Sequence, residues 1–462
     1  MAFDSTPPSS SPRRMNTGLV ATVVIIAVAL VVAGVAYAFG WPPFGSMRTD
    51  EPSMTAEPTQ TAIDPVPVMA PWTKTLCGAG NDRFTDVAVG PDGVIVAVGQ
   101  TYSNDSDYAD VEGYSPDYAS GVVAHFAPDG ELLSLDITPG RHYDAVDIGP
   151  DGTIVVVGGT NTGAMRSQPF MMKLAADGSV LWTVDKVDES QLNGAYTGVS
   201  ISEWGNISVT GYYMGDYPVE GEAFVAQVDA SGEPRWFKPA HSLDRYDDVA
   251  TLPTGDVVVV GSSYGTREMR DAPNTAMALR VTSDGTPVWY QVYSDNGVTL
   301  FSSHFSSVAV AHNGVVVAGD SNDSREGGYA NDDGDALIGF IHGSGELEWI
   351  ENKGGQGTTS FTGVTFFANS WIVAVGETDS PGGDFPSPNA GNEQRDGFVA
   401  QFPLEGAVDR VEVFGGSAWD SLSRVVSTPS GIIAVGLTSS RDGNLPATCG
   451  DYDALIMYIA LA

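Results

Sequence analysis

Seven copies of one short pattern constrain what this chain can fold into. In each copy a Val-rich segment ends at a glycine, and successive copies of that glycine lie 50–60 residues apart. These glycines are Gly99, Gly158, Gly211, Gly261, Gly319, Gly376 and Gly436. Repetition at such a period is typical of propellers and solenoids, in which each unit buries its apolar faces against its neighbours.

Each copy contains the material for four short strands. An apolar strand leads through a tight turn into the Val-rich strand, a polar loop of variable length follows, and a second tight turn separates the third strand from the fourth. The fourth strand often carries a tryptophan: Trp182, Trp236, Trp289 and Trp349. The chain has 55 Gly and 28 Pro, which suit many turns and argue against a helical bundle. We therefore predict an all-β fold, a seven-bladed β-propeller of four-stranded antiparallel blades, over residues 71–462.

The two ends of the repeat region predict a closed ring. The last copy stops after its third strand, at 453–460, while an orphan strand at 72–76 precedes the first copy. The orphan strand resembles a fourth strand such as 181–185, so we expect it to complete the seventh blade. An open solenoid is the alternative, and it would need polar caps at its ends.

The two cysteines fit such a ring. Cys77 follows the orphan strand and Cys449 precedes the last third strand. Antiparallel pairing of those two strands would bring the sulfurs together, and an exported chain meets an oxidising environment. We predict a Cys77–Cys449 disulfide, with two buried free thiols as the alternative. Two cysteines are too few for a Cys-based zinc or iron–sulfur site.

The N-terminal segment predicts a membrane anchor. Residues 19–39 form an uncharged apolar run long enough to cross a bilayer, with Arg13 and Arg14 before it and Trp41 after it. We expect a short cytoplasmic tail at 1–17, a transmembrane helix at 18–41 and a disordered Pro/Thr-rich linker at 42–70. The alternative is a cleaved signal peptide, since 36–38 has the small-x-small form of a cleavage site. The propeller is extracytoplasmic in both cases, on the cell membrane or secreted.

Several units resemble a known bacterial repeat. The segments 155–160, 170–178 and 181–182, and likewise 373–378, 383–386 and 396–399, are similar to the SBBP-type β-propeller repeat. The resemblance implies the fold and surface display, and it implies no activity. A Gly-x-x-x-Trp element, as at 178–182, is also similar to blades of pyrroloquinoline-quinone dehydrogenases, where the tryptophan docks one blade on the next. That likeness implies packing alone.

Charge excludes one class of partner and suggests where a ligand binds. With 58 acidic and 21 basic side chains, the net charge is −37, and nucleic acid would be repelled. The variable loops share one face of the predicted propeller, which we expect to be acidic and to carry the binding site. A solvated acidic surface without a ligand is the alternative. The candidate residues on this face are Tyr108, Tyr114, His142, Tyr212, Tyr213, His241, His304, Asp332, Asp333 and Asp335.

One loop has the composition of a calcium site. Asp105, Asp107, Asp110 and Glu112 offer oxygen ligands close together in the sequence, as Ca²⁺ prefers. Their spacing departs from the EF-hand pattern, and ordinary Asx-rich turns explain them equally well. A similar cluster occupies 331–335. The six histidines have no spacing suited to tetrahedral zinc.

Aligning the units brings one further set of residues to a common position, the start of each innermost strand. These are Phe84, Tyr143, Tyr196, Tyr246, Phe305, Phe361 and Leu422. They could ring the mouth of the central channel, but we favour blade-to-blade packing as their role.

Together these features predict a monomeric, membrane-anchored propeller that acts as a binding or scaffold module at the cell envelope. Its partner would be an envelope protein or a glycan, and Ca²⁺ is the one cofactor that the sequence suggests. The alternatives are an extracytoplasmic, glycan-acting enzyme with carboxylates at the channel mouth, and a purely structural surface protein. No catalytic motif is present in the sequence, so no catalytic residue is assigned.

Overall fold

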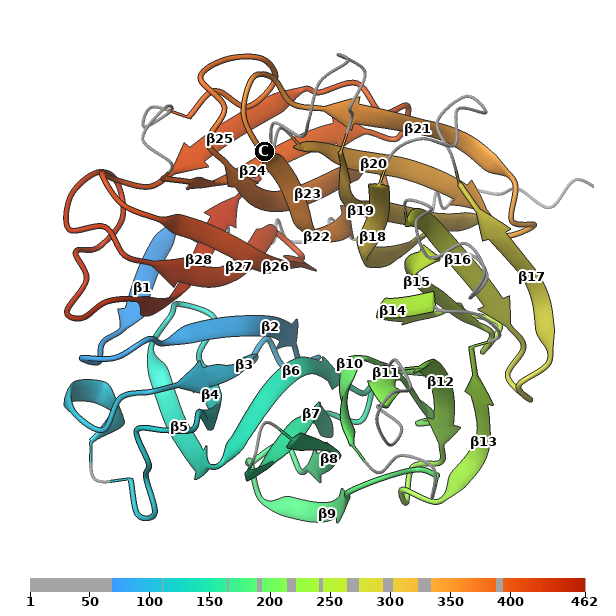
Figure 1. Ribbon diagram of the computed structural model, residues 1–462, viewed down its shortest axis with the longest axis horizontal. Helices are drawn as coiled ribbons and strands as arrows, with labels where there is room; N and C mark the ends of the chain where they lie inside the picture. The colour runs from blue at the N-terminus through green and yellow to red at the C-terminus, as the bar shows by residue number, and fades with distance from the viewer. Residues whose placement is uncertain are drawn as a thin grey trace, which may run out of the picture. The chain divides into compact units, whose positions relative to one another are not determined.

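The computed structural model describes residues 69–461 apart from 110, 164–165, 189–192, 214–221, 241–243, 264–273, 294–301, 323–333 and 388–393. The predicted tail, transmembrane helix and almost all of the linker therefore lie outside the described residues. Within the described part, no helix has the length and apolar character needed to cross a bilayer. The described strands form seven separate four-stranded antiparallel sheets arranged around an axis (Figure 1).

Each of the first four blades is a meander whose strands are numbered outward from the axis. Blade 1 comprises β2 (Arg83–Val89), β3 (Ile95–Thr101), β4 (Ser120–Phe126) and β5 (Leu132–Pro139), with the short 3-10 helix η1 (Ser106–Tyr108) between β3 and β4. Blade 2 comprises β6 (Arg141–Ile148), β7 (Ile154–Gly163), β8 (Arg166–Leu174) and β9 (Val180–Val184). Blade 3 comprises β10 (Gly194–Ile201), β11 (Ile207–Tyr213), β12 (Glu222–Val228) and β13 (Pro234–Pro239). Blade 4 comprises β14 (Asp244–Thr251), β15 (Val257–Ser263), β16 (Thr275–Val281) and β17 (Pro287–Val292).

The last three blades complete the ring. Blade 5 comprises β18 (Ser302–Ala311), β19 (Gly314–Asn322), β20 (Gly334–His342) and β21 (Leu347–Lys353). Blade 6 comprises β22 (Thr359–Phe367), β23 (Trp371–Thr378), β24 (Asp396–Pro403) and β25 (Arg410–Phe414). Blade 7 comprises β26 (Asp420–Thr428), β27 (Gly431–Thr438), β28 (Asp453–Ala460) and, as its outer strand, β1 (Trp72–Leu76). The predicted seven-bladed fold is confirmed.

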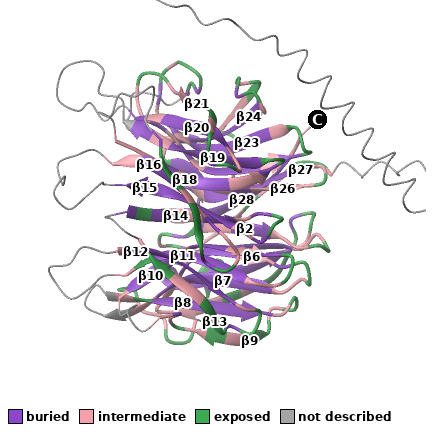
Figure 2. Cartoon of the chain, turned by 90° about the vertical axis from the view of Figure 1, so that its right-hand side faces the viewer, coloured by how far each residue is buried: buried purple, intermediate pink, exposed green. Residues whose placement is uncertain are grey.

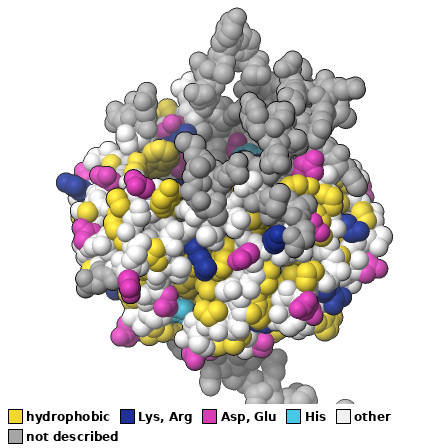
Figure 3. Space-filling view, turned by 60° about the horizontal axis from the view of Figure 1, so that its bottom comes forward, with side chains coloured by type: hydrophobic (Ala, Val, Ile, Leu, Met, Phe, Trp, Pro, Cys, Tyr) yellow, Lys and Arg dark blue, Asp and Glu magenta, His cyan; other side chains and the backbone are white. Residues whose placement is uncertain are grey.

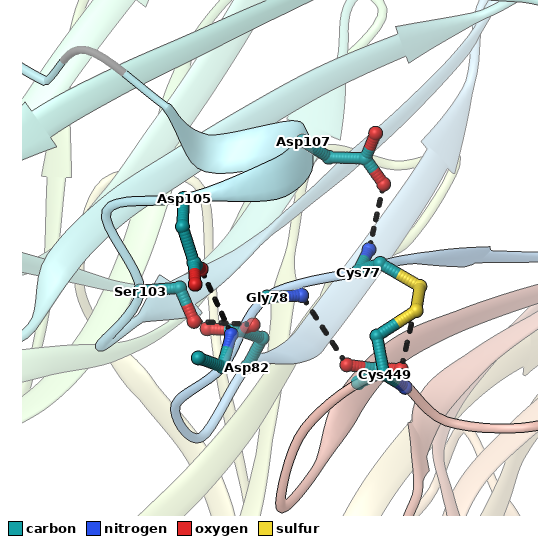
Figure 4. The surroundings of a disulfide bond; sticks show 9 residues. Cys77, Gly78, Asp82, Ser103, Asp105, Asp107 and Cys449 are labelled. Carbon is teal, nitrogen blue, oxygen red and sulfur yellow. Dashed lines mark hydrogen bonds between the residues drawn. A yellow bond between two sulfur atoms is a disulfide. The ribbon is translucent and has the colours of Figure 1, made fainter.

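Closure of the ring is confirmed strand by strand. β1 pairs antiparallel with β28, from Trp72 opposite Tyr458 to Leu76 opposite Ala454. Cys77, one residue beyond β1, forms the predicted disulfide with Cys449, with 5.5 Å between the two Cα atoms (Figure 4). The buried Asp453 supports the junction, because its carboxylate accepts the backbone N–H of Cys449 at 2.7 Å and of Gly78 at 3.4 Å.

The core lies between blades, as expected for sheets buried on both faces. The described residues contain seven apolar clusters, and each one joins two neighbouring blades. Buried residues follow the inner strands of each blade, whereas exposed residues lie in the turns and on outer strands such as β13 (Figure 2). The seven aligned positions from Phe84 to Leu422 are all buried in these clusters. Blade-to-blade packing is therefore their role.

Tryptophans dock the outer strands onto the next blade. The Trp236 indole N–H donates to the carbonyl of Ser283 in blade 4 at 3.1 Å. The ring lies against Gly285, where φ is +85° and an added Cβ would sit 2.8 Å from the indole. The same bond to the following blade is made by Trp72, Trp182, Trp289 and Trp349. Trp72 therefore docks blade 7 onto blade 1, which adds a second link across the closure.

We predict that removing the disulfide lowers stability without changing the fold. A Cys77→Ser/Cys449→Ser variant should lose up to about 5–6 kcal/mol of unfolding free energy, because the bridge closes a very long loop in the unfolded chain. The measurement is chemical denaturation of both proteins with and without reductant. The wild type should respond to reductant and the double variant should not. Equal stability of the two proteins under oxidising conditions would contradict the prediction.

Candidate functional site at the propeller axis

Every innermost strand contains a one-residue bulge at the same place. In each blade the register with the second strand shifts immediately after the aligned Phe, Tyr or Leu, so one residue is left without a partner. The bulged residues are Thr85, Asp144, Thr197, Asp247, Ser306, Thr362 and Ser423. A bulge redirects a side chain out of the regular ladder, and here it does so once per blade around the axis.

In four blades the bulged side chain is a hydroxyl that links one blade to the next. It donates to the carbonyl of the aligned residue in the following blade. The bonds are Thr85 to Tyr143 at 2.7 Å, Thr197 to Tyr246 at 2.9 Å, Ser306 to Phe361 at 2.7 Å and Thr362 to Leu422 at 2.5 Å. A hydroxyl that bonds to the next blade is therefore the usual structural feature of the repeat at this position.

Blades 2 and 4 lack this hydroxyl, because Asp144 and Asp247 stand at the bulge. An ionised carboxylate has no proton to donate, so neither residue can replace the hydroxyl in its charged form. Asp247 Oδ1 accepts from Arg245 Nε at 2.7 Å, and Asp144 Oδ2 lies 3.5 Å from His142 Nε2. The Asp247 side chain is 10% exposed, and its buried Oδ2 has no hydrogen-bond partner among the described residues.

Charged and aromatic side chains surround these two carboxylates. Burial raises the pKa of Asp144, and the charges of His142 and Arg83 oppose that rise. Burial likewise raises the pKa of Asp247 against the opposing charges of Arg245, His304 and Arg424. Tyr212, which is 37% exposed on β11, has its pKa raised by burial and by the charge of Asp144.

His304 extends the cluster into blade 5. Its Nδ1 lies 2.9 Å from Asp320 Oδ1. Burial lowers the pKa of His304, but the hydrogen bond to Asp320 and the charges of Asp320 and Asp247 outweigh burial, so the pKa is raised. We call Arg83, His142, Asp144, Tyr212, Arg245, Asp247, His304 and Asp320 the axial cluster.

Arg424 lies beside this cluster and spans the axis from blade 7. Its Nη1 donates to the carbonyls of Ser306 at 3.0 Å and Thr362 at 2.7 Å. Its guanidinium also lies 3.9 Å from Asp86 Oδ1 in blade 1 and 3.8 Å from Asp248 Oδ2 in blade 4. The Arg424 side chain therefore contacts four other blades. Its positive charge faces the carboxylates of Asp86 and Asp248.

Three carboxylates clamp neighbouring innermost strands together. Asp86 accepts the N–H of Val87 and of Val146 in the next blade, both at 2.8 Å. Asp248 accepts in the same way from Val249 at 2.9 Å and from Val308 at 3.0 Å. Asp147 makes the corresponding pair of bonds between blades 2 and 3. Burial nevertheless raises the pKa of Asp86 to about 7 and that of Asp147 to about 6.

Asp105 and Asp107, two of the predicted calcium ligands, hold the backbone of the closure. Asp107 Oδ2 accepts from Cys77 N at 2.7 Å and Asp105 Oδ1 from Ala79 N at 2.9 Å (Figure 4). In blade 7 the neutral Asn444 makes the equivalent bond, to Gly415 N at 2.8 Å. These contacts favour the Asx-turn interpretation of the loop. Glu112 is exposed and Asp110 lies outside the described residues, so calcium binding stays a prediction.

The predicted binding-face residues divide into separate groups. His142, Tyr212 and His304 belong to the axial cluster. Tyr108 is buried in the core of blades 1 and 7, and thus differs from the exposed position expected of it. The Tyr114 hydroxyl donates to the Tyr102 carbonyl at 2.8 Å, that of Tyr213 donates to Glu222 at 2.7 Å, and Asp335 is half-buried on β20. His241, Asp332 and Asp333 lie outside the described residues.

Sequence reasoning missed the carboxylates and the arginine at the axis. Among the 58 acidic residues no pair stands out by spacing. A usable signal was present one residue after the aligned Phe, Tyr or Leu, where five copies carry Thr or Ser and two carry Asp. Comparing this one position across the seven copies of the repeat would have identified Asp144 and Asp247.

The fold defines the class of this chain as a seven-bladed β-propeller. No family model matches the sequence, and no curated protein does. The SBBP-type resemblance therefore stays a prediction.

Among solved structures with a similar arrangement are three propeller proteins. BamB from Moraxella catarrhalis is 11% identical with a TM-score of 0.41, covering 82% of this chain and 86% of that one. Streptogramin B lyase is 10% identical with a TM-score of 0.46, covering 84% and 98%. The WD40 domain of Neurospora crassa Pan2 is 10% identical with a TM-score of 0.47, covering 86% and 99%. No functional conclusion follows from likeness at this level.

We predict that this protein is more stable at mildly acidic pH than at neutral pH. The folded state raises the pKa of Asp86 to about 7 and of Asp147 to about 6, from an ordinary value near 4. Between those values the folded chain holds protons that the unfolded chain has released, so the free energy of unfolding falls as pH rises. The melting temperature should be several degrees higher at pH 5 than at pH 7.5, measured by scanning calorimetry.

The Asp86→Asn variant tests whether this dependence arises at the axis. Its amide carries no titrating proton, so the difference between the two melting temperatures should shrink. Asp177→Asn, which removes a carboxylate from an exposed turn, is the matched control and should keep the wild-type difference. An unchanged pH dependence in Asp86→Asn would refute the assignment.

Proposed function

We propose that this chain is an extracytoplasmic binding module, anchored to the membrane by residues 18–41, whose ligand contacts the loop-face end of the propeller axis. The observation that carries the proposal is the axial cluster. It gathers titratable and aromatic side chains from five blades, and two of them replace a hydroxyl that the repeat otherwise uses for structure. Perturbed titratable groups gathered at one place on a rigid scaffold are typical of binding and catalytic sites.

The disulfide supports the extracytoplasmic location. Disulfides persist in oxidising compartments and are rare in the cytosol, and the Cys77–Cys449 bridge lies at the junction that closes the ring. The sequence places an apolar segment and a Pro/Thr-rich linker directly before that junction. These two segments suit a domain that is anchored by the apolar segment and held away from the bilayer by the linker.

The composition supports a partner that is not itself strongly acidic. The chain carries a net charge of −37. On the side of the molecule shown in Figure 3, acidic side chains lie singly among neutral and apolar ones rather than in one continuous patch. We therefore place the ligand at the axis, where oppositely charged groups are concentrated, and we propose an envelope protein or a glycan as its source.

We predict that Tyr212 contacts the partner in cells. A photoreactive phenylalanine analogue at Tyr212, which is exposed and central to the axial cluster, should form an adduct on irradiation of intact cells. The matched control is the same analogue at Leu181, which is exposed on the outer strand of blade 2. Adducts are detected as shifted bands and identified by mass spectrometry. Equal adducts at both positions, or none at Tyr212, would overturn the axial binding site.

We predict that residues 1–41 are needed for export and retention. An alkaline phosphatase fused to the C-terminus should be active in cells and should sediment with membranes. Deleting residues 1–41 should leave the fusion inactive, because phosphatase disulfides do not form in the cytosol. An active soluble fusion of reduced mass from the full-length gene would instead indicate a cleaved signal peptide.

One observation favours catalysis as a second function. Burial raises the pKa of both Asp144 and Asp247, and a raised pKa is what a carboxyl needs to act as the general acid on a glycosidic bond. For a binding module we expect an envelope glycan to be recovered uncleaved after incubation. New reducing ends that appear with the wild type and are lost in Asp144→Asn would assign an enzyme instead.

A further inference from the structure

We propose that reduction of the Cys77–Cys449 bridge turns the ring closure into a zinc site, with the two thiolates and the carboxylate of Asp453 as ligands. The site lies where β28 and β1 of blade 7 are joined, and it does not depend on the proposed function at the axis. Zinc bound there would replace the disulfide as the link between residues 77 and 449.

Three ligand atoms already lie together at the closure. The two sulfurs and one carboxylate oxygen of Asp453 are all within 4.8 Å of one another. Cys77 Sγ lies 3.6 Å from Asp453 Oδ2. A Zn–S bond of about 2.3 Å and a Zn–O bond of about 2.0 Å at the tetrahedral angle place their sulfur and oxygen about 3.5 Å apart. Cys77 and Asp453 therefore stand at the separation that one zinc ion requires.

Backbone N–H groups hold the Asp453 carboxylate in this position. Its Oδ2 accepts the N–H of Cys449 at 2.7 Å, and its Oδ1 accepts that of Gly78 at 3.4 Å. Hydrogen bonds of this kind orient the carboxylates that ligate metal ions. A carboxylate oxygen accepts more than one bond, so Oδ2 keeps a lone pair for zinc.

The neighbouring charges favour a cation at the same place. Asp107 Oδ2 accepts from Cys77 N at 2.7 Å (Figure 4). Burial raises the pKa of Asp453, and the charge of Asp107 raises it further. Two thiolates would add negative charge beside these carboxylates, and a bound cation would neutralise it. Thiolate ligands select zinc over calcium or magnesium, which prefer oxygen.

The conversion requires a thiol reductant, and solvent gives it access to the bridge because Cys449 is exposed. A dithiol attacks one sulfur as its thiolate. The bridge takes up two electrons and two protons and becomes two thiols, while the dithiol becomes a disulfide. Zinc then binds both sulfurs as thiolates, the two protons pass to water, and the sulfurs move to about 3.8 Å apart. A water molecule would supply the fourth ligand.

Such a zinc ion would preserve the closed ring under reducing conditions. Both links join the residue after β1 to the loop that precedes β28, and β1 keeps its backbone pairing with β28 in either state. The apolar cluster between blades 1 and 7 would stay covered. The closure would thus have two alternative links, with the redox state deciding which one is present.

Cobalt(II) is the probe for this site, because it occupies zinc sites and its bonds to thiolate absorb light. The full-length chain in nonionic detergent is reduced with dithiothreitol, freed of it by gel filtration under argon and titrated with Co²⁺. Thiolate–cobalt absorption should saturate at one Co²⁺ per chain, disappear on adding Zn²⁺ and be absent from the oxidised chain. No such absorption in the reduced chain, equal absorption in the oxidised chain, or its loss on adding Ca²⁺ would overturn the proposal.

Substitutions identify the ligands. Cys77→Ser and Asp453→Asn each remove one ligand, so the affinity of the reduced chain for Co²⁺ should fall at least tenfold in each variant. Asp451→Asn removes the same charge from an exposed position two residues away and should bind as the reduced wild type does. Wild-type affinity in Asp453→Asn would refute the site.

Thermal unfolding provides a second readout that needs only the wild-type chain. Zn²⁺ should raise the melting temperature of the reduced chain by several degrees, because it binds the folded state and restores the link. The oxidised chain, whose sulfurs are already bonded, should not respond. A reduced chain that melts at the same temperature with and without Zn²⁺ would reject zinc as the alternative link.

Discussion

The pairing of β1 with β28 is the interaction on which the rest of this structure depends. Each blade buries both faces against its neighbours, so a ring left open would expose the apolar faces of blades 1 and 7. The cluster between those blades contains Phe84 and Val122 from one side and Ile433 and Tyr458 from the other. Five residues of β1, the docking of Trp72 on blade 1 and the Cys77–Cys449 bridge keep this cluster covered.

Two rings of side-chain-to-backbone bonds then hold the blades in place at different radii. At the rim, tryptophans such as Trp236 donate to a turn of the next blade. At the axis, hydroxyls such as Thr197 and carboxylates such as Asp86 do the same for the innermost strands. The inner ring is where the repeat is broken, by Asp144 and Asp247. We thus infer function at the one position where most blades carry a hydroxyl residue and two blades carry an aspartate instead.

Much of the fold could be predicted because its signals are local in the sequence. Val-rich strands ending at glycine define the blades, and counting strands at both ends predicts closure and the disulfide. The candidate site was harder to predict, since the bulge at which Asp144 and Asp247 stand depends on the register between strands. Arg424 meets Asp248 only after the ring has closed, so spacing carries no trace of it. Tyr108 was a candidate for the binding face, yet it is buried in the core between blades 1 and 7.

The position of the disulfide has a mechanical consequence. A pull on the chain from its N-terminal side would enter the propeller through β1 and strip it from β28, beginning at Trp72. The strand ends at Leu76, and Cys77 is joined to Cys449 on the loop that precedes β28. Tension would therefore pass through the sulfurs into blade 7 after five residues had come away. The bridge would act as a stop that spares blade 1 from unravelling under such a pull.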